Sequence, residues 1–556
     1  MRKIFLISFC LSTSITNAQW QWAMRAGSGN SEMGCSSATD GSGNVYVTGY
    51  FLSGNITFGS FTLNSLGGND VFVVKYNASG IVLWAKSFGG GGGGDDESFS
   101  ITADISGNTY ITGYFKDSSI TFGSFTLINS GLQDVFIVKL NSSGVVQWAK
   151  SATNCFASYG QSIKIDASGN ILVTGVFFGT AINFGSTTIN STNSNSTDIF
   201  IVKYNSAGSV VWLRDAGGID VETPNNITAD ATGNFYITGY FQGPSTKFGS
   251  ITLNNSNNGT FDIFIVKYNT SGTALWAKSA GGNKNEEGKG LVTDANGYVY
   301  LTGYFESTTI LFGSITLNNI DNTGMSEDIF ITKYDASGNV VWSKREGGTD
   351  SDIGYGIVVD ANSDIYVTGF FANSNIIFGN DTLYYLGIAD VFLVKYDSSG
   401  NIIWAESAGG ISEDISFSIS IDLNSNLYLT GYFWGAACTF GNTTLNNSGV
   451  QDVFLAKHSS LSGINEFNLE EIISVYPNPS TGIFTLQSTK EITAIEIYNV
   501  LGENISPLSL RRGVGGEVEI NLSEAAKGIY FIKIITPSPL GEGWGEVYST
   551  QKLLIR

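Results

Sequence analysis

The chain has 556 residues, of which 42% are hydrophobic, 14% charged and 13% aromatic, a composition typical of a globular protein with several apolar cores. A single histidine excludes most Ser/His/Asp, Cys/His and imidazole acid–base mechanisms, because these need histidine at the reacting group. The net charge of −20 disfavours nucleic acids and anionic membrane surfaces, whose binding depends on neutralising phosphates. We therefore expect no nucleic-acid partner.

Residues 1–18 have the features of a secretory signal peptide. Arg2 and Lys3 form a basic start, an apolar run follows over residues 4–11, and a small residue precedes Gln19. No later stretch approaches the roughly 18 to 20 apolar residues that a helix needs to cross a bilayer. We expect an exported mature chain, starting at residue 19, with no membrane span.

A repeated unit fills residues 19–458. A string of Asp, aliphatic, Phe, aliphatic, then Val, Thr or Ala, then Lys begins at Asp70, Asp134, Asp198, Asp262, Asp328, Asp390 and Asp452. Each unit also carries an Asp-x-x-Gly-Asn turn, a Thr-Gly-Tyr-Phe run, a Phe-Gly-Ser segment and a Trp-centred run, or close variants of these. The apolar period is two and Val, Tyr, Phe and Thr dominate, which predicts strands. Four strands in each of seven units predict an all-β chain with a seven-bladed β-propeller.

The two ends of the repeat region indicate ring closure. The seventh unit stops after the strand at 452–457 without a Trp-centred run, whereas the mature chain begins with such a run around Trp22, which matches the run around Trp84. We expect the N-terminal strand to pair beside residues 452–457, with Trp22 in the position that Trp84 takes in the first unit. An open solenoid would need no such shift and would carry atypical capping repeats instead.

The core of the repeat, as in DGSGNVYVTGY (40–50) and DISGNTYITGY (104–114), resembles the SBBP family of β-propeller repeats. This resemblance implies a propeller fold and an extracellular setting, and it brings no catalytic residues. The unit is longer than an ordinary blade of about 40 to 50 residues because of the Phe-Gly-Ser segment. We expect these segments to form long loops at one end of the ring.

A polar linker at 459–471 precedes a different period-two pattern over 472–556. Five or more short strands in about 85 residues predict a small Ig-like β-sandwich. The ordered motifs resemble the type A C-terminal sorting domain of the type IX secretion system, through Tyr476, Pro477, Asn478, Pro479, Gly502, Gly528, Tyr530 and Lys552. The resemblance implies that residues 472–556 engage the type IX secretion machinery and that the protein is secreted or held on the outer cell surface. Two Gly/Pro-rich stretches, 506–518 and 536–547, depart from the family pattern, and we expect them to be loops.

An acidic residue recurs about ten residues after the tryptophan of each unit, in the connection to the next one. The set comprises Glu32, Asp96, Glu222, Glu286, Asp352 and Asp414, and the third unit has Ser158 instead. In an up-and-down blade this connection lies at the same end as the Phe-Gly-Ser segments. A ring of carboxylates around the mouth of the channel could bind Ca²⁺ or another cationic ligand. The alternative is that these are solvated loop side chains.

These features favour a monomeric, secreted or surface-attached binding or adhesion module whose long-loop end engages a glycan or a protein. A rigid scaffold that carries variable loops is common in binding proteins. One alternative is a carbohydrate-active lyase or hydrolase that uses paired loop carboxylates. Another is a structural surface component. No acid pair stands outside the repeat, so we assign no catalytic residue, and Ca²⁺ at the acidic ring is the one cofactor we consider.

Overall fold

The computed structural model describes residues 20–52, 54–321, 323–459, 473–476, 480–488, 494–499, 503–505, 509–512, 517–537 and 546–555. The predicted signal peptide, all of the predicted linker except Ser459, and the motif residues Pro477, Asn478, Pro479 and Gly502 lie outside these ranges. The described residues form strands and no helix, which confirms the all-β prediction. Accordingly, this part of the chain contains no helix that could cross a membrane. The chain divides into two compact units, Met1–Leu461 and Ser462–Arg556.

The first sheet shows how the repeat folds. It consists of β2 (Glu32–Thr39), β3 (Val45–Leu52), β6 (Asn69–Tyr76) and β7 (Val82–Phe88), antiparallel and hydrogen-bonded in that order. Nearly every side chain of β3 and β6 is buried, whereas buried and exposed residues alternate more in β7. A strand that is apolar on both faces must be covered on both faces. The two inner strands are therefore packed between neighbouring sheets, and β7 forms the outer edge.

Six further sheets in the described part of the first unit repeat this order. They are β8 (Asp96–Ala103), β9 (Thr109–Phe115), β12 (Asp134–Leu140) and β13 (Val146–Ser151); β14 (Ala157–Ile165), β15 (Ile171–Phe178), β18 (Thr197–Tyr204) and β19 (Val210–Gly218); β20 (Glu222–Ala229), β21 (Phe235–Phe241), β24 (Asp262–Tyr268) and β25 (Ala274–Ala280); β26 (Glu286–Thr293), β27 (Val299–Phe305), β30 (Asp328–Tyr334) and β31 (Val340–Glu346); β32 (Asp352–Val359), β33 (Ile365–Ala372), β36 (Ala389–Tyr396) and β37 (Ile402–Gly410); and β38 (Asp414–Ile421), β39 (Asn426–Trp434), β42 (Gln451–Ser459) and β1 (Trp20–Ala26). We number these seven sheets in chain order, so that the seventh contains β1.

The Phe-Gly-Ser segments are hairpins, not the long loops that the sequence predicted. In the first unit of the repeat, β4 (Asn55–Phe58) pairs with β5 (Phe61–Asn64) around Gly59, whose φ of +56° suits a tight turn. The equivalent pairs are β10 (Ser119–Phe122) and β11 (Phe125–Ile128), β16 (Ala181–Phe184) and β17 (Thr187–Asn190), β22 (Ser245–Phe248) and β23 (Ile251–Asn254), β28 (Thr309–Phe312) and β29 (Ile315–Asn318), β34 (Ile376–Phe378) and β35 (Asp381–Leu383), and β40 (Ala437–Phe440) and β41 (Thr443–Asn446). The segment keeps period two on both sides of its glycine, so it pairs with itself. Each hairpin stands between the second and third strands of its sheet, at what we call the hairpin end.

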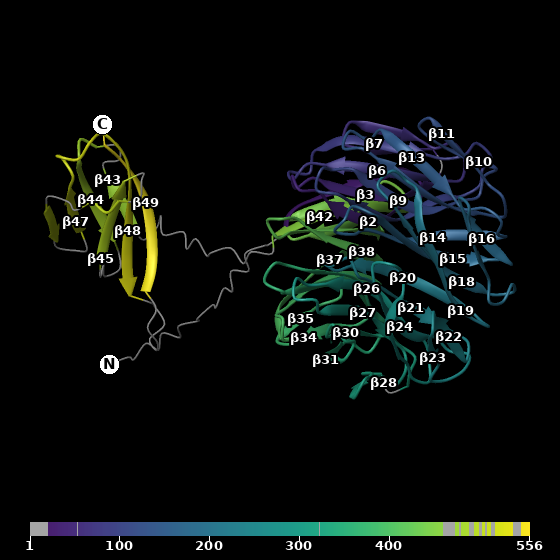
Figure 1. The fold of residues 1–556 in the computed structure, drawn as a ribbon. Helices are drawn as coiled ribbons and strands as arrows, with labels where there is room; N and C mark the ends of the chain where they lie inside the picture. The colour runs from purple at the N-terminus through teal and green to yellow at the C-terminus, as the bar shows by residue number, and fades with distance from the viewer. Residues whose placement is uncertain are drawn as a thin grey trace. The chain divides into compact units, whose positions relative to one another are not determined.

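The N-terminal strand joins the last sheet of the repeat. Strand β1 pairs antiparallel with β42, and Trp22 lies opposite Lys457 as Trp84 lies opposite Lys75. The predicted pairing beside residues 452–457 is thus confirmed. In Figure 1, light-green β42 lies beside purple β2 and β3, although these segments stand at opposite ends of the repeat region.

The sheets contact their neighbours in sequence and return to the start. The first strands lie next to one another, with β2 beside β8, β8 beside β14, β14 beside β20, β20 beside β26, β26 beside β32, β32 beside β38, and β38 beside β2. At the return step, the backbone N–H of Ser37 in the first sheet donates to Oγ of Ser418 in the seventh, at 3.1 Å. These first strands therefore surround a common axis.

Five of the seven outer strands are hydrogen-bonded to the following sheet through the indole N–H of their tryptophan, whereas the indole N–H of Trp22, in β1, has no partner. The indole N–H of Trp84 donates to the carbonyl oxygen of Ser142 at 3.1 Å, and Lys75 Nζ donates to the same oxygen at 3.3 Å. The ring lies against Gly144, where a Cβ atom would come within 2.9 Å of it. The repeated tryptophans and lysines thus connect adjacent sheets, which explains why they recur.

The C-terminal unit has two sheets in its described part. Strands β43 (Ile473–Tyr476), β44 (Ile483–Ser488), β47 (Glu517–Asn521) and β46 (Ser509–Arg512) form one, and β45 (Ala494–Asn499), β48 (Gly528–Pro537) and β49 (Glu546–Ile555) form the other. Buried residues from both sheets, including Phe484, Ile520 and Ile532, share one core, as in a sandwich. The stretch 506–518 was expected to be a loop, but it contains β46 and the start of β47, because its Leu-Arg-Arg run pairs with β47.

Candidate functional site

The six recurrent acids lie at the hairpin end, each as the first residue of the first strand of its sheet. All face the same partner position on the second strand; Glu32, for example, lies opposite Phe51, and Glu286 opposite Phe305. Their side chains are nevertheless fully buried, at 0% exposure for Glu32, Asp96, Glu222, Glu286, Asp352 and Asp414. The expectation that these carboxylates are exposed, either at the mouth of the channel or on solvated loops, is therefore wrong. The ligand role that we gave them stays a prediction.

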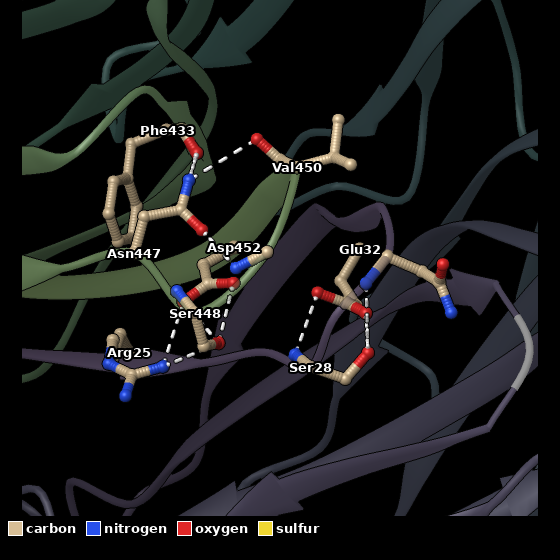
Figure 2. A network of polar contacts seen from close by, with 10 residues as sticks. Arg25, Ser28, Glu32, Phe433, Asn447, Ser448, Val450 and Asp452 are labelled. Atoms are coloured by element: carbon tan, nitrogen blue, oxygen red, sulfur yellow. Dashed lines mark hydrogen bonds and ion pairs between the residues drawn. The ribbon is translucent and has the colours of Figure 1, made fainter.

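Five of the six buried acids, all except Glu222, accept backbone N–H groups from the connection that precedes them. The N–H groups of Gly282, Gly348 and Gly410 donate to Glu286, Asp352 and Asp414 at 3.0, 2.5 and 2.6 Å. Figure 2 shows the same arrangement where the seventh sheet meets the first, with the N–H of Ser28 donating to Glu32 at 3.1 Å. A carboxylate that accepts loop N–H groups fixes the connection between two sheets. Sequence alone could not show this, because the same residue types also suit an exposed turn.

A second set of buried acids stands next to the first. The aspartates that begin the Asp-x-Phe strands accept N–H groups from the loop behind each hairpin, as in Asp390 with Leu386 at 2.5 Å and Asp452 with Ser448 at 3.0 Å. Arg25 also binds Asp452, at 2.8 Å (Figure 2). A Cβ atom on Gly409 would lie 1.7 Å from Asp390 Oδ1, so the glycine after the Trp-centred strand is required by this close approach. At each junction that contains an acid of both sets, the two carboxyl groups therefore lie close enough for their charges to interact.

Burial changes the proton affinity of these groups. It raises the pKa of Glu32, Asp96 and Asp414 to about 7, and that of Glu222, Glu286 and Asp352 to about 8. The neighbouring aspartate adds to the effect, since the charge on Asp328 further raises the pKa of Asp352. These carboxyl groups therefore titrate near neutral pH. Within the described ranges, no three His, Cys, Asp or Glu side chains gather in a way that could hold a metal ion.

The structure reveals a cavity that the sequence did not indicate. It has a volume of about 260 Å³, lies on the common axis toward the hairpin end, and receives side chains from the first strand of every one of the seven sheets. Each of these strands contains a β-bulge. The bulged residues all line the cavity: Cys35, Phe99, Gln161, Asn225, Lys289, Tyr355 and Phe417. A bulge redirects a side chain, and here it turns one residue of each sheet toward the axis.

One signal in the sequence could have located this axial cavity. The residue type at the bulged position changes from unit to unit, with only phenylalanine used twice, whereas the positions around it recur. A position that varies within a regular repeat is free of the constraint that the fold places on its neighbours. The recurrent positions by themselves do not indicate the cavity.

An exposed apolar cluster lies at the hairpin end of the sixth and seventh sheets. It consists of Leu386, Ile388, Ile411 and Trp434, of which Ile411 is 75% and Leu386 63% exposed. Backbone contacts hold these segments together, since the N–H of Ile388 donates to Ser412 O at 2.9 Å and that of Trp434 to Glu413 O at 2.8 Å. Exposed apolar side chains on segments that are held together in this way can form an interaction surface.

The motif residues of the C-terminal unit have mixed positions. Tyr530 is buried in the core and donates its hydroxyl hydrogen to Ala526 O at 2.7 Å, whereas Tyr476 is exposed at the end of β43. Gly528 begins β48, and Lys552 lies in β49 opposite Phe531. Tyr530 therefore stabilises the sandwich, while Tyr476 is available for contacts.

Comparison with known proteins identifies the C-terminal unit. Residues 474–538 match the family described as secretion system C-terminal sorting domain. The sorting domain predicted from the motifs is therefore confirmed, and with it export through the type IX secretion system to the cell surface.

The repeat unit has more distant relatives. The chain is 26% identical, over 80% of its length, to an uncharacterized WD repeat-containing protein, L264, of Acanthamoeba polyphaga mimivirus, and 30% identical, over 20% of its length, to the regulatory protein FlaEY of Caulobacter vibrioides. It spans 38% and 12% of the lengths of these two proteins. Among solved structures it is similar to a puromycin hydrolase mutant complexed with PGG, with a TM-score of 0.40 and 10% identity over 83% of this chain and 59% of that one.

Proposed function

We propose that the repeat unit is a closed seven-bladed β-propeller of the SBBP type and that the chain is a cell-surface binding protein carried outward by its sorting domain. The resemblance to a WD repeat-containing protein supports the propeller, as do the pairing of β1 with β42 and the contact of β38 with β2. A closed ring leaves no sheet edge open between its first and last blades. It thus provides a rigid scaffold at the cell surface.

The exposed apolar cluster is the observation that carries the binding function. Leucine, isoleucine and tryptophan side chains in water cost free energy that a partner surface would recover, at about 25 cal/mol per Å² of apolar area. Tryptophan is also enriched among the residues that dominate binding energy. The cluster stands at the hairpin end, where loops connect the blades.

The cluster favours a protein partner with an apolar centre and a basic rim. Its aliphatic side chains offer no hydrogen bonds to the hydroxyl groups of a glycan. Glu413 lies directly beside it in the chain, and the whole protein carries a net charge of −20. Such a field attracts cationic surfaces and repels acidic ones.

Export is tested by removing residues 472–556. We expect the truncated protein to stay in the periplasm, on the inner side of the outer membrane, with an unchanged melting temperature, because each unit has a hydrophobic core of its own. Cell fractionation and immunoblotting of the producing organism measure the distribution. Normal surface display of the truncated chain would disprove the role of the sorting domain.

Binding is tested on an array of purified extracellular proteins of basic and acidic isoelectric point, with a glycan array in parallel. We expect basic proteins to bind, and Trp434→Ala and Ile411→Ser to weaken binding by about tenfold or more, or about 1.4 kcal/mol each. Ile105→Ser, an equally exposed residue on an Asp-x-x-Gly-Asn turn, is the matched control and should bind normally. Binding of glycans alone, self-association through the cluster, or binding that both variants retain would refute the proposal.

A further inference from the structure

The axial cavity has two chemically different sides. Going around the axis, the sixth, seventh, first and second sheets contribute Tyr355, Phe417, Tyr50 and Phe99. The third, fourth and fifth sheets contribute Gln161, Asn225 and Lys289. Aromatic side chains are thus collected on one side and hydrogen-bonding side chains on the other.

The aromatic side is a packed wall. The rings of Tyr355 and Phe417 meet edge to face with centroids 5.1 Å apart, and Phe417 lies 5.7 Å from Tyr432. Phe99 contacts Tyr114 at 5.6 Å on the second sheet. Rings that support one another in this way keep a fixed orientation, so they present a prepared apolar surface to the cavity.

On the polar side, the charge of Lys289 is neutralised by an ion pair with Glu287. Lys289 Nζ lies 2.6 Å from Glu287 Oε2, and the hydroxyl group of Tyr304 donates to the other oxygen of the same carboxylate at 2.7 Å. Asn225 Nδ2 donates to Gly288 O at 2.9 Å and so is held in place by the neighbouring strand. An anionic ligand would have to compete with Glu287 for the ammonium group, whereas the hydroxyl group of a neutral ligand can accept one of the remaining hydrogens of Lys289.

Small polar residues form the inner end of the cavity. Ser36, Ser100, Ser162 and Ser418 line it and also line a second cavity, of about 280 Å³, farther along the same strands, and their hydroxyl oxygens accept N–H groups from the next sheet, as Ser100 does from Ile163 at 3.2 Å. These hydroxyl groups keep a hydrogen to donate. The volume of about 260 Å³ is slightly below the range of about 300 to 1,000 Å³ for small-molecule sites, which suits a small ligand such as one ring.

We propose that the axial cavity binds one neutral sugar ring, such as the terminal residue of a glycan. A pyranose has an apolar face of C–H groups that suits the wall of Phe417, Tyr355 and Phe99, and a rim of hydroxyl groups that suits Gln161, Asn225 and Lys289. A wholly apolar ligand would displace water from the Gln161 amide and from the remaining hydrogens of the Lys289 ammonium group without replacing those hydrogen bonds, which costs free energy. This site is separate from the apolar cluster, so it adds a second binding activity to the proposed function.

The test uses the full mature chain and a panel of methyl glycosides of glucose, galactose, mannose, fucose, xylose and N-acetylglucosamine, with glucuronate and glucosamine as charged members. Saturation-transfer NMR detects binding and isothermal titration calorimetry measures it. We expect at least one neutral glycoside to bind. Phe417→Ala and Gln161→Ala should each weaken it by about tenfold, while Phe156→Ala, an exposed aromatic residue outside the cavity, leaves it unchanged.

A cavity-filling variant, Gln161→Trp, separates loss of binding from misfolding. It leaves the aromatic wall in place, so it should abolish binding with little change in melting temperature. Binding that persists in this variant would overturn the proposal. So would the absence of binding by every neutral glycoside, or a preference for glucuronate that Lys289→Met removes. None of these outcomes depends on whether a protein partner binds the apolar cluster.

Discussion

Strand β1 should contribute strongly to the stability of the repeat unit, and Trp20 is the residue at which its contribution is best measured. Trp20 is 8% exposed and lies edge to face against Phe440 and His458, with ring centroids 5.1 and 5.0 Å away. Replacing a buried tryptophan by alanine costs about 3 to 5 kcal/mol, because the cavity is only partly refilled. Trp20→Ala should lower the free energy of unfolding by this amount. Gln21→Ala, an exposed change on the same strand, should alter it by about 0.5 kcal/mol or less.

Deleting residues 20–26 should do more. It removes the pairing with β42, the buried Ala23 and Ala26, and the ion pair between Arg25 and Asp452. Since proteins are stable by about 5 to 15 kcal/mol, the loss should unfold part of the population and leave β42 as an open edge that aggregates. Urea unfolding followed by circular dichroism, with light scattering for aggregation, measures both effects. A deletion variant that stays monomeric with an unchanged urea midpoint would show that β1 does not close the ring.

Other predictions concern the junctions between sheets. Burial raises the pKa of Glu286 to about 8, so its folded state holds the proton more tightly than the unfolded chain; this contribution to stability is complete below about pH 4.5 and is lost as pH rises through about 8. Glu286→Gln should therefore make the urea midpoint fall less between about pH 5 and pH 8, and an unchanged slope would contradict the shift. Gly409→Ala should destabilise the protein by about 1 to 3 kcal/mol, because its Cβ would collide with a buried aspartate, whereas Gly91→Ala has open space and should be neutral; equal melting temperatures would argue against the close approach. Ser418→Ala should lower the free energy of unfolding by about 1 to 3 kcal/mol, because it leaves the Ser37 N–H without its acceptor. An unchanged urea midpoint would argue against a stabilising hydrogen bond between the seventh and first sheets.

Much of the fold followed from the sequence because the signals are local and repeated. Period-two alternation within each unit is enough to assign strands, and seven copies average out the errors of any one. The position of Trp22 at one end of the repeat and the missing Trp-centred run at the other predicted the pairing of β1 with β42. The motifs around Tyr476 and Tyr530 likewise predicted the sorting domain from their order alone. The hairpins and the stretch 506–518 were mistaken for loops, because the strands of the hairpins, like β46, are only three or four residues long.

The sites could not be predicted in this way, and the reason is physical. Whether Glu286 points to water or to the N–H of Gly282 depends on how two sheets meet, and its residue type fits both environments. The recurrence of such acids indicates a structural role that is common to the units, namely the buried hydrogen bonds to the connecting loops. The side chains of the axial cavity come from eight strands spread over nearly 400 residues, and only the arrangement of the sheets around an axis brings Phe417 and Gln161 into one space. The sequence by itself thus determined the strands, the pairing of the chain's first strand with its last repeat, and the export signal. The tertiary structure decided which polar groups are buried and which varying residues face one another, because burial and proximity depend on packing between sheets and not on the pattern within a strand.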